Sequence, residues 1–434
     1  MIRITVCPDR RAGRVRPVHG VGQPPFQGLD FSMLQTLTAA KIPFSRLHDV
    51  GGAFGGGRFV DVPNVFPDFD RDPADPANYD FAFTDRLIGA LVEAGVEPYY
   101  RLGVTIENHA ALRAYRIHPP RDFLHWAKIA EGIIRHYTEG WADGFRYPIR
   151  YWEIWNEPEN GMAGVKPNMM WTGTMEDYFE LYRVSTLYLK EKFPHLKFGG
   201  YASSGLYNVL PEKHRDEHPY TGALAEYRVE IFRRFLRFVK EKGCPLDFFS
   251  WHSYEDRPSY NALYARFVRK TLDEYGFRET ESHLNEWNGE ATVARGTVHH
   301  AAVTAANLCV LQREGVDAAM FYDARLGASV YGALYHPLTH RPLPAYYPFL
   351  AFGELYGCGT AVAVETEGED VFAVAAEGEE RSEVLAVNLG EESPFVLDVG
   401  GHAPALCRLL TEEGWRVCPL PDRLPKDGVL WITV

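Results

Sequence analysis

The protein has 434 residues, of which 46% are hydrophobic and 24% are charged. This length exceeds what one ordinary hydrophobic core holds, so we expect a soluble globular protein with one large domain and a smaller one. The net charge of −13 and the lack of any Lys/Arg-rich block argue against a nucleic-acid or anionic-membrane partner, which would favour a basic surface.

The first residues, from Met1 to Pro8, lack the apolar core of a signal peptide, and no apolar run approaches the length that spans a bilayer. The six cysteines form no C-x-x-C pair, which is typical of reduced and mostly buried thiols in a chain of this size. A bridge between Cys407 and Cys418 across a hairpin is the alternative. We therefore expect a cytoplasmic protein without a membrane segment.

Short β-branched or aromatic segments alternate with long helical patterns along most of the chain, which is typical of repeated βα units and a parallel sheet. The eight predicted strands are residues 15–20, 44–48, 98–103, 149–156, 197–201, 248–252, 283–287 and 319–322. Among the helical patterns between them are residues 81–94, 178–192, 223–242 and 297–314. Eight βα units close into a barrel more readily than they extend into an open sheet. The predicted fold is α/β, a (β/α)₈ TIM barrel over residues 8–356.

After residue 357 the pattern changes to short apolar segments separated by Gly, Pro and acidic turns, which is typical of antiparallel strands. These segments are residues 360–365, 371–376, 384–388, 395–399, 405–410 and 429–434. We predict a small C-terminal β-sandwich domain over residues 357–434. Because this length is thin for a sandwich, the alternating segment within residues 1–7 could complete one of its sheets.

Two loops resemble ligand-binding motifs without satisfying them. The glycine-rich segment at residues 51–57 lacks the Lys-Ser/Thr of a phosphate-binding loop, and no helix pattern begins there. The acidic segment at residues 68–79 has Pro73 and Tyr79 where a calcium loop needs Gly and Glu. We interpret both as loops, and we predict no metal and no cofactor.

Two segments of similar form carry the candidate chemistry. Residues 151–156 have strand composition, and Pro158 cannot continue a central strand because it lacks an N–H donor. Glu157 is therefore predicted at the C-terminal end of the fourth strand, the end at which barrel enzymes carry out their reactions. In residues 283–289, a short apolar stretch likewise ends in Glu286, followed by Trp287, on the seventh strand.

The fourth and seventh strands lie opposite each other, so Glu157 and Glu286 can face a common point. Hydrolysis of a glycosidic bond needs two such carboxyl groups, which in the retaining mechanism stand about 5–5.5 Å apart. Because two close carboxylates resist double ionisation, one of them keeps its proton and can act as an acid. The alternative is that each glutamate is an ordinary strand-end residue in a salt bridge. The presence of both motifs on opposite strands favours the catalytic interpretation.

The motif Trp155-Asn156-Glu157-Pro158 on the fourth strand, together with Glu286 on the seventh, resembles the clan A retaining glycosidases. Nearly the whole chain is similar to glycoside hydrolase family 39, the family of β-xylosidases and α-L-iduronidases. This resemblance implies that Glu157 is the acid/base group and that Glu286 is the nucleophile.

The resemblance also implies roles for the residues around the two glutamates. Asn156 is implied to bind the 2-hydroxyl group of the sugar. The other residues implied to line the sugar site are His48, His252 and Asp323. Arg46 and Tyr254 are similar to the residues that hold clan nucleophiles ionised and oriented. The alternatives are that Arg46 pairs with Glu153 inside the barrel and that the two histidines are core residues.

Two departures from the family pattern bear on the substrate. Many relatives carry Trp on the eighth strand, whereas this chain has Met-Phe-Tyr-Asp at residues 320–323, so Tyr322 or Trp287 is expected to form the sugar platform. Tyr254 stands where the iduronidase branch has a lysine for the uronate, which favours a neutral sugar.

We therefore predict a retaining glycoside hydrolase, β-xylosidase-like and exo-acting, whose partner is an oligosaccharide or small glycoside. An endo-acting glycanase is an alternative, because the loops at residues 51–57 and 163–171 could wall an open cleft. An α-L-iduronidase- or arabinosidase-like glycosidase is another. A non-catalytic carbohydrate-binding barrel would be expected to lose a catalytic carboxylate, whereas this sequence keeps both glutamates. A metal-dependent barrel hydrolase would need a His-x-His pair on a strand, and the predicted strands contain none.

Overall fold

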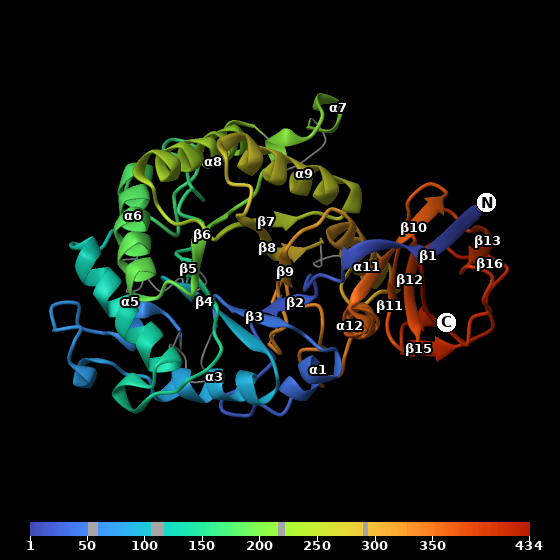
Figure 1. Cartoon of the computed structure of the whole chain (residues 1–434), viewed down its shortest axis with the longest axis horizontal. Coiled ribbons are helices and arrows are strands. Elements are labelled where there is room, and N and C mark those ends of the chain that lie inside the picture. Colours follow the sequence, from blue (N-terminus) through green and yellow to red (C-terminus); the bar gives the residue numbers. More distant parts are fainter. Residues whose placement is uncertain (51–59, 106–116, 216–221, 290–293, 328) are drawn as a thin grey trace.

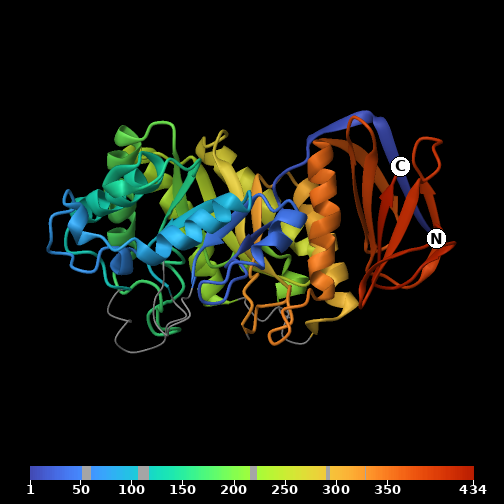
Figure 2. The same ribbon diagram turned by 90° about the horizontal axis from the view of Figure 1, so that it is seen from below.

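The computed structural model describes residues 1–434 apart from residues 51–59, 106–116, 216–221, 290–293 and 328. The glycine-rich loop predicted at residues 51–57 lies outside the described residues. The described residues form a closed barrel of parallel strands beside a large antiparallel-rich sheet (Figures 1 and 2). The predicted TIM barrel with a C-terminal β-sandwich domain is confirmed.

The barrel closes in chain order, so that each strand pairs in parallel with the next and β9 pairs with β2. Its strands are β2 (Gly20–Gly22), β3 (Phe44–Leu47), β4 (Glu97–Leu102), β5 (Tyr151–Ile154), β6 (Lys197–Ser203), β7 (Phe248–Tyr254), β8 (Glu281–Asn288) and β9 (Ala318–Phe321). Only the first strand is displaced from its predicted place, residues 15–20. The chain there still runs beside the second domain, where the Val15 N–H donates to the Gly359 carbonyl, and Pro17 has no N–H for a strand ladder.

Helices surround the barrel (Figure 1). They are α1 (Leu34–Ala39), α2 (Val62–Val65), α3 (Ala82–Glu93), α5 (Phe123–Thr138), α6 (Met175–Lys192), α7 (Glu212–Arg215), α8 (Ala223–Lys242), α9 (Pro258–Tyr275), α11 (Val298–Arg313) and α12 (Tyr347–Cys358). The four predicted helical patterns correspond to α3, α6, α8 and α11. Helix α6 begins three residues before its predicted start because Thr174 and Asp177 form a capping box. No helix within the described residues is long and apolar enough to span a membrane.

The second sheet has the strand order β15-β14-β17-β12-β11-β10-β1-β13-β16. Its strands are β1 (Ile2–Arg14), β10 (Thr360–Glu367), β11 (Val371–Glu377), β12 (Ser382–Asn388), β13 (Ser393–Asp398), β14 (Leu406–Thr411), β15 (Gly414–Val417), β16 (Arg423–Leu424) and β17 (Gly428–Thr433). The N-terminal strand β1 lies between β10, with which it is antiparallel, and β13, with which it is parallel. All six cysteines are free thiols, including Cys407 and Cys418.

Strands β11 and β12 are buried on both faces, which explains their continuous apolar runs. Side chains such as Phe372 and Leu385 belong to the same apolar cluster as the barrel, because this face packs on α11 and α12. The alternate side chains, such as Ala373 and Val384, join Ile4 in a separate cluster inside the sandwich. The sheet is thereby anchored to the outer face of the barrel, as Figure 2 shows.

The barrel interior is layered along its axis. Its lower layer is apolar and aromatic, with Phe44, Tyr99, Tyr151 and Phe248 among its members. Because side chains alternate along a strand, the next inward-facing residues are two positions further on, and in β3, β4 and β5 these are Arg46, Arg101 and Glu153. The apolar layer closes the bottom of the barrel, and the charged layer above it supports the mouth.

Replacement of Ile4 tests how far the sandwich depends on the N-terminal strand. Ile4 is 0% exposed in the sandwich cluster, so Ile4→Ala is expected to lower the free energy of unfolding by about 2–5 kcal/mol. Urea denaturation followed by fluorescence measures this change. As a control on the same strand, Arg10→Ala removes only a surface ion pair with Glu365 and should cost less than about 1 kcal/mol. A loss for Ile4→Ala as small as that of the control would contradict this role of β1.

Candidate active site

A sharp turn after β5 directs Glu157 toward the centre of the barrel mouth. Trp155 has φ 72° and Glu157 has φ 45°, a left-handed region that few non-glycine residues occupy. The Glu157 N–H lies 3.1 Å from the carbonyl oxygens of both Tyr201 and Ala202 at the end of β6. The neighbouring strand thus holds the turn that carries this carboxyl group.

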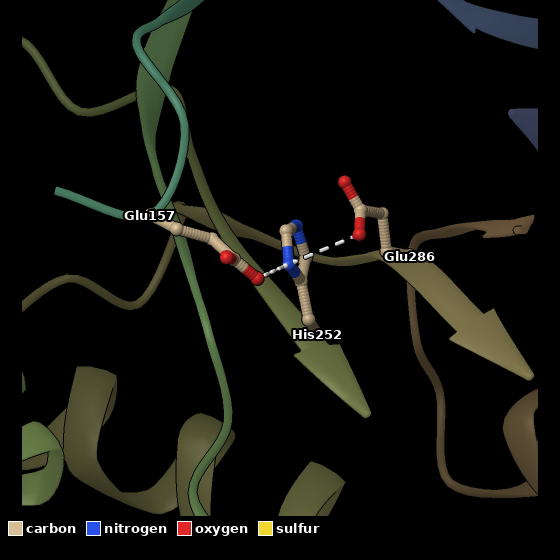
Figure 3. Close-up of side chains that lie close together, drawn as sticks. All are labelled: Glu157, His252 and Glu286. Carbon is tan, nitrogen blue, oxygen red and sulfur yellow. Dashed lines mark hydrogen bonds and ion pairs between the residues drawn. The ribbon is translucent and has the colours of Figure 1, made fainter. Parts of the chain in front are cut away.

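Glu157, His252 and Glu286 converge at the mouth, with His252 between the two glutamates (Figure 3). The His252 Nδ1 atom is 2.7 Å from Glu157 Oε1 and 3.4 Å from Glu286 Oε2. One ligand atom from each of the three side chains lies within 4.8 Å of the other two. The two carboxyl groups that the sequence places on opposite strands therefore face each other at close range.

Glu286 is held by two donors. Arg46 Nη1 donates to its Oε1 at 2.6 Å, and the Tyr254 hydroxyl donates to its Oε2 at 2.7 Å. Burial and the nearby Glu286 charge raise the pKa of Tyr254, so this hydroxyl stays a donor. Arg46 also donates to Glu153 from Nε at 2.8 Å. Arg46 thus has both of the partners proposed for it, the barrel-interior glutamate and the candidate nucleophile.

Glu157 has a different environment. Burial raises its pKa, while the positive charges of Arg228, Lys166 and Arg46 and a hydrogen bond from Asn160 act in the opposite direction. The Asn160 Nδ2 atom donates to Glu157 Oε2 at 2.5 Å. No cation bonds directly to this carboxyl group among the described residues. Glu157 is therefore the better suited of the two carboxyl groups to keep a proton.

The two histidines implied to line the sugar site are both buried and neutral. Burial lowers the pKa of His252 to about 4. Burial, together with the charges of Arg101 and Arg46, holds the pKa of His48 well below its usual range. His48 Nδ1 accepts from Arg101 Nε at 3.1 Å, so Nε2 carries the ring proton, and it lies 3.3 Å from Asp49 and 3.8 Å from Glu286.

Asn156 is oriented for binding at the mouth. Its Oδ1 atom accepts from Arg46 Nη2 at 2.6 Å, while its Nδ2 atom is buried without a hydrogen-bond partner among the described residues. Because a buried amide N–H group without a partner is costly, this donor is suited to a ligand oxygen. The placement agrees with the role that the resemblance implies for Asn156.

Tyr322 and Asp323 lie at the end of β9. The Tyr322 hydroxyl donates to Asp49 at 2.9 Å, and its ring packs edge-on against Tyr254 at a centroid distance of 6.2 Å. Asp323 is 0% exposed and pairs with Arg325 Nε at 2.6 Å. Tyr322 therefore stands beside the candidate nucleophile's partner Tyr254, whereas Asp323 is held in an ion pair.

Trp287 does not reach the mouth. The residue is 1% exposed, and its ring packs against Phe321 and against Phe349 of α12. The cause is an irregularity in β8, where His252 of β7 pairs with Glu286 although the preceding residue, Trp251, pairs with Leu284. This extra residue reverses the alternation, so Glu286 points inward and Trp287 points outward. Trp287 thus lies in the packing layer between the barrel and α12 and offers no ring to a sugar.

The structure adds polar residues that the sequence interpretation did not single out. They are Asp49, Arg101, Asp61, Asn160, Lys166, Arg228 and Arg325. Arg101 could have been identified from the sequence, because it is a charged residue at an inward-facing position of a predicted strand. Lys166 and Arg228 lie in a loop and on α8, and no sequence pattern connects them to Glu157.

Among the described residues, Glu157, His252 and Glu286 are also the group whose ligand atoms lie close enough together to hold a metal ion. Arg46 already supplies a positive charge to Glu286 at 2.6 Å. A divalent cation would have to share that carboxylate with the buried guanidinium, an unfavourable arrangement for a metal site. The donor set fits a pair of reacting carboxyl groups better than a metal centre.

Comparison with known proteins agrees with the motifs. The family model for glycosyl hydrolases family 39 matches residues 62–324, more than half of the chain. A β-xylosidase of Geobacillus stearothermophilus is 23% identical over 342 residues, which are 69% of this chain and 61% of that protein. The chain thus spans less than two thirds of the length of this relative.

Solved structures show the same fold over the whole chain. A glucosidase of Croceicoccus marinus has a TM-score of 0.78 at 21% identity, covering 100% of this chain and 98% of that structure. A family 39 β-xylosidase of Caulobacter crescentus has a TM-score of 0.66 at 17% identity, covering 100% and 99%. With a family model that covers residues 62–324, the resemblance is confirmed, and the chain belongs to glycosyl hydrolases family 39.

Proposed function

We propose that this protein is a retaining glycoside hydrolase with Glu157 as acid/base and Glu286 as nucleophile. The observation that carries the proposal is the close approach of the two carboxyl groups: one oxygen of Glu157 lies within 4.8 Å of one oxygen of Glu286. Retaining enzymes place these groups about 5–5.5 Å apart, whereas inverting enzymes need about 6.5–9.5 Å to admit a water molecule. The spacing therefore supports a double displacement.

In the first step, the Glu286 carboxylate attacks the anomeric carbon while the glycosidic bond breaks. Protonated Glu157 gives its proton to the departing oxygen, which leaves an alcohol and a covalent glycosyl-enzyme. In the second step, Glu157 takes a proton from water, and the resulting oxygen attacks the anomeric carbon and releases Glu286. Arg46 and Tyr254, which donate to Glu286, stabilise the carboxylate that starts the cycle and leaves at its end.

We propose a neutral glycoside as the substrate, cleaved from its end in the manner of a β-xylosidase. Three arginines near Glu286 support a neutral sugar because each already has an acidic partner: Arg46 pairs with Glu286, Arg101 with Asp61, and Arg325 with Asp323. A uronate would have to compete with these carboxylates. Two relatives named β-xylosidase, of which the Caulobacter crescentus enzyme is described as family 39, support a pentose.

We also propose a cytoplasmic location. The six cysteines are free thiols in the structure, and such thiols persist in a reducing compartment. Cell fractionation with an antibody against the protein would test this location.

The first test measures the sugar preference. Among nitrophenyl glycosides of matched leaving group, the β-xyloside should have the highest kcat/KM. The β-glucuronide and α-L-iduronide should be lower by at least about tenfold, because their carboxylates would compete with Glu286, Asp61 and Asp323 for the arginines that these residues already bind. The glucosidase among the structural relatives makes the β-glucoside the most informative comparison. Preference for a uronide would contradict the neutral-sugar proposal.

The second test separates the roles of the two glutamates. Glu157→Ala should still react with a dinitrophenyl glycoside, because this leaving group needs no proton, and added azide should give a glycosyl azide of retained configuration. Glu286→Ala should lose more than about 10⁴-fold in kcat, and azide should give the inverted product. Product configuration is read by NMR.

The exposed residue Glu212 on α7 gives a matched control for both substitutions, and Glu212→Ala should keep the parent rate. Melting temperatures show whether each variant is folded. Azides of the same configuration from the two active-site variants, or full activity of Glu286→Ala without azide, would show that the roles are assigned wrongly.

The third test is the pH profile of kcat/KM. Burial raises the pKa of Glu157, so this group stays protonated toward neutral pH, and activity should fall at higher pH as its proton is lost. In Glu157→Gln the side chain does not titrate, so the fall at high pH should disappear from the remaining activity. A high-pH fall that persists in this variant would identify another group as the acid.

A further inference from the structure

We propose that Asn160 is a positioning residue for the Glu157 carboxyl group, and that Lys166 and Arg228 hold the Asn160 amide in the orientation this role requires. The proposal rests on the assignment of Glu157 as the acid/base group. These three residues lie outside the Trp-Asn-Glu-Pro motif at residues 155–158. The turn after β5 brings Asn160 to Glu157, the following loop brings Lys166, and α8 brings Arg228.

Asn160 contacts Glu157 through both its backbone and its side chain. The Asn160 backbone N–H donates to the Glu157 carbonyl at 3.0 Å, which closes the turn, and the side-chain Nδ2 donates to Glu157 Oε2 at 2.5 Å. His252 lies 2.7 Å from the other oxygen, Oε1. With one partner on each oxygen, the plane of the Glu157 carboxyl group is defined.

The two cations determine which way the Asn160 amide faces. Its Oδ1 atom accepts from Lys166 Nζ at 2.6 Å and from Arg228 Nη2 at 3.2 Å. The opposite orientation would place an NH₂ group against two positive charges and an oxygen against a carboxylate. The amide therefore presents a donor to Glu157, and this donor is polarised by the charges behind it.

Such a donor favours the carboxylate form of Glu157, the form that must take a proton from water in the second step. Burial raises the pKa of Glu157, while Arg228, Lys166, Arg46 and the Asn160 hydrogen bond lower it. The charged or titratable groups that face it are His252 from β7, Glu286 from β8, Arg46 from β3, Arg228 from α8, and Glu159 and Lys166 from its own loop. Loss of Asn160 removes a lowering contribution, so the pKa of Glu157 should rise further.

Lys166 is the member of this group that can be changed without disturbing the core. Its side chain is exposed and lines a cavity of about 740 Å³ together with Trp171 and Tyr227. Arg228, in contrast, is 7% exposed on α8. A Lys166→Met substitution keeps most of the length of the side chain and removes its charge.

The experiment compares Asn160→Ala, Lys166→Met and the double variant. In Asn160→Ala the high-pH limb of kcat/KM should move to higher pH, and kcat for a dinitrophenyl glycoside, which reports the second step, should fall by about tenfold. Lys166→Met should cause smaller changes in the same directions. In the double variant, the shift of the high-pH limb that Lys166→Met adds should be smaller than the shift it causes alone, because Lys166 acts partly through Asn160.

Two further variants serve as controls. Lys166→Arg should restore the parent profile, and Lys240→Met, which removes an exposed lysine near the far end of α8, should leave it unchanged. A high-pH limb that stays in place in both Asn160→Ala and Lys166→Met would overturn the proposal, as would full additivity in the double variant. If the melting curve shows that Asn160→Ala is unfolded, the test rests on Lys166→Met alone. An unchanged high-pH limb in Lys166→Met then overturns the proposal.

This outcome is distinguishable from a failure of the proposed function. The azide products of Glu157→Ala and Glu286→Ala test the two roles without involving Asn160. Correct azide products with an unmoved pH limb would refute the positioning role alone, whereas wrong azide products would refute the assignment of Glu157 itself.

Discussion

The active site is organised around one buried guanidinium group, that of Arg46. This side chain is 1% exposed and donates to Glu153, Glu286 and Asn156. Burial lowers its pKa, but the two glutamates raise it by more, so the group stays charged inside the barrel. Loss of a partner from such a network would leave a charge buried and uncompensated, which costs about 3–5 kcal/mol. Arg46 thereby couples the packing of the charged interior layer to the position of the candidate nucleophile.

The same arrangement makes the carboxyl groups of Glu157 and Glu286 chemically unequal. Glu286 has a cation and a tyrosine hydroxyl on its oxygens, whereas Glu157 has an amide and an imidazole. His252 stays neutral between them because burial lowers its pKa to about 4, so it adds no charge to either. This difference in partners supports the proposal that Glu286 is the nucleophile and that Glu157 transfers the proton.

Most of the fold could be predicted from sequence because each of its elements leaves a local signal. Alternation at residues 2–6 predicts a half-buried strand, and β1 is that strand. The doubly buried runs of β11 and β12 and the helical spacing of α8 are equally local. The first barrel strand was predicted several residues too early. Val15 does not belong to the barrel sheet; it lies where the chain leaves the second sheet, and its N–H donates to the Gly359 carbonyl.

For the site, the sequence by itself predicted the two glutamates, since Pro158 cannot continue a central strand and an apolar run leads to Glu286. The structure ends β5 earlier, at Ile154, and a sharp turn carries Glu157. Which side chain of β8 faces the mouth was decided only by tertiary structure. Strict alternation would send Trp287 inward, but the extra residue in the pairing of β8 with β7 turns Glu286 inward instead. Likewise, the contact of Arg228 with Asn160 joins a helix to a loop 68 residues away. Local patterns record burial and strand ends, whereas register shifts and contacts between distant elements depend on how the whole barrel closes.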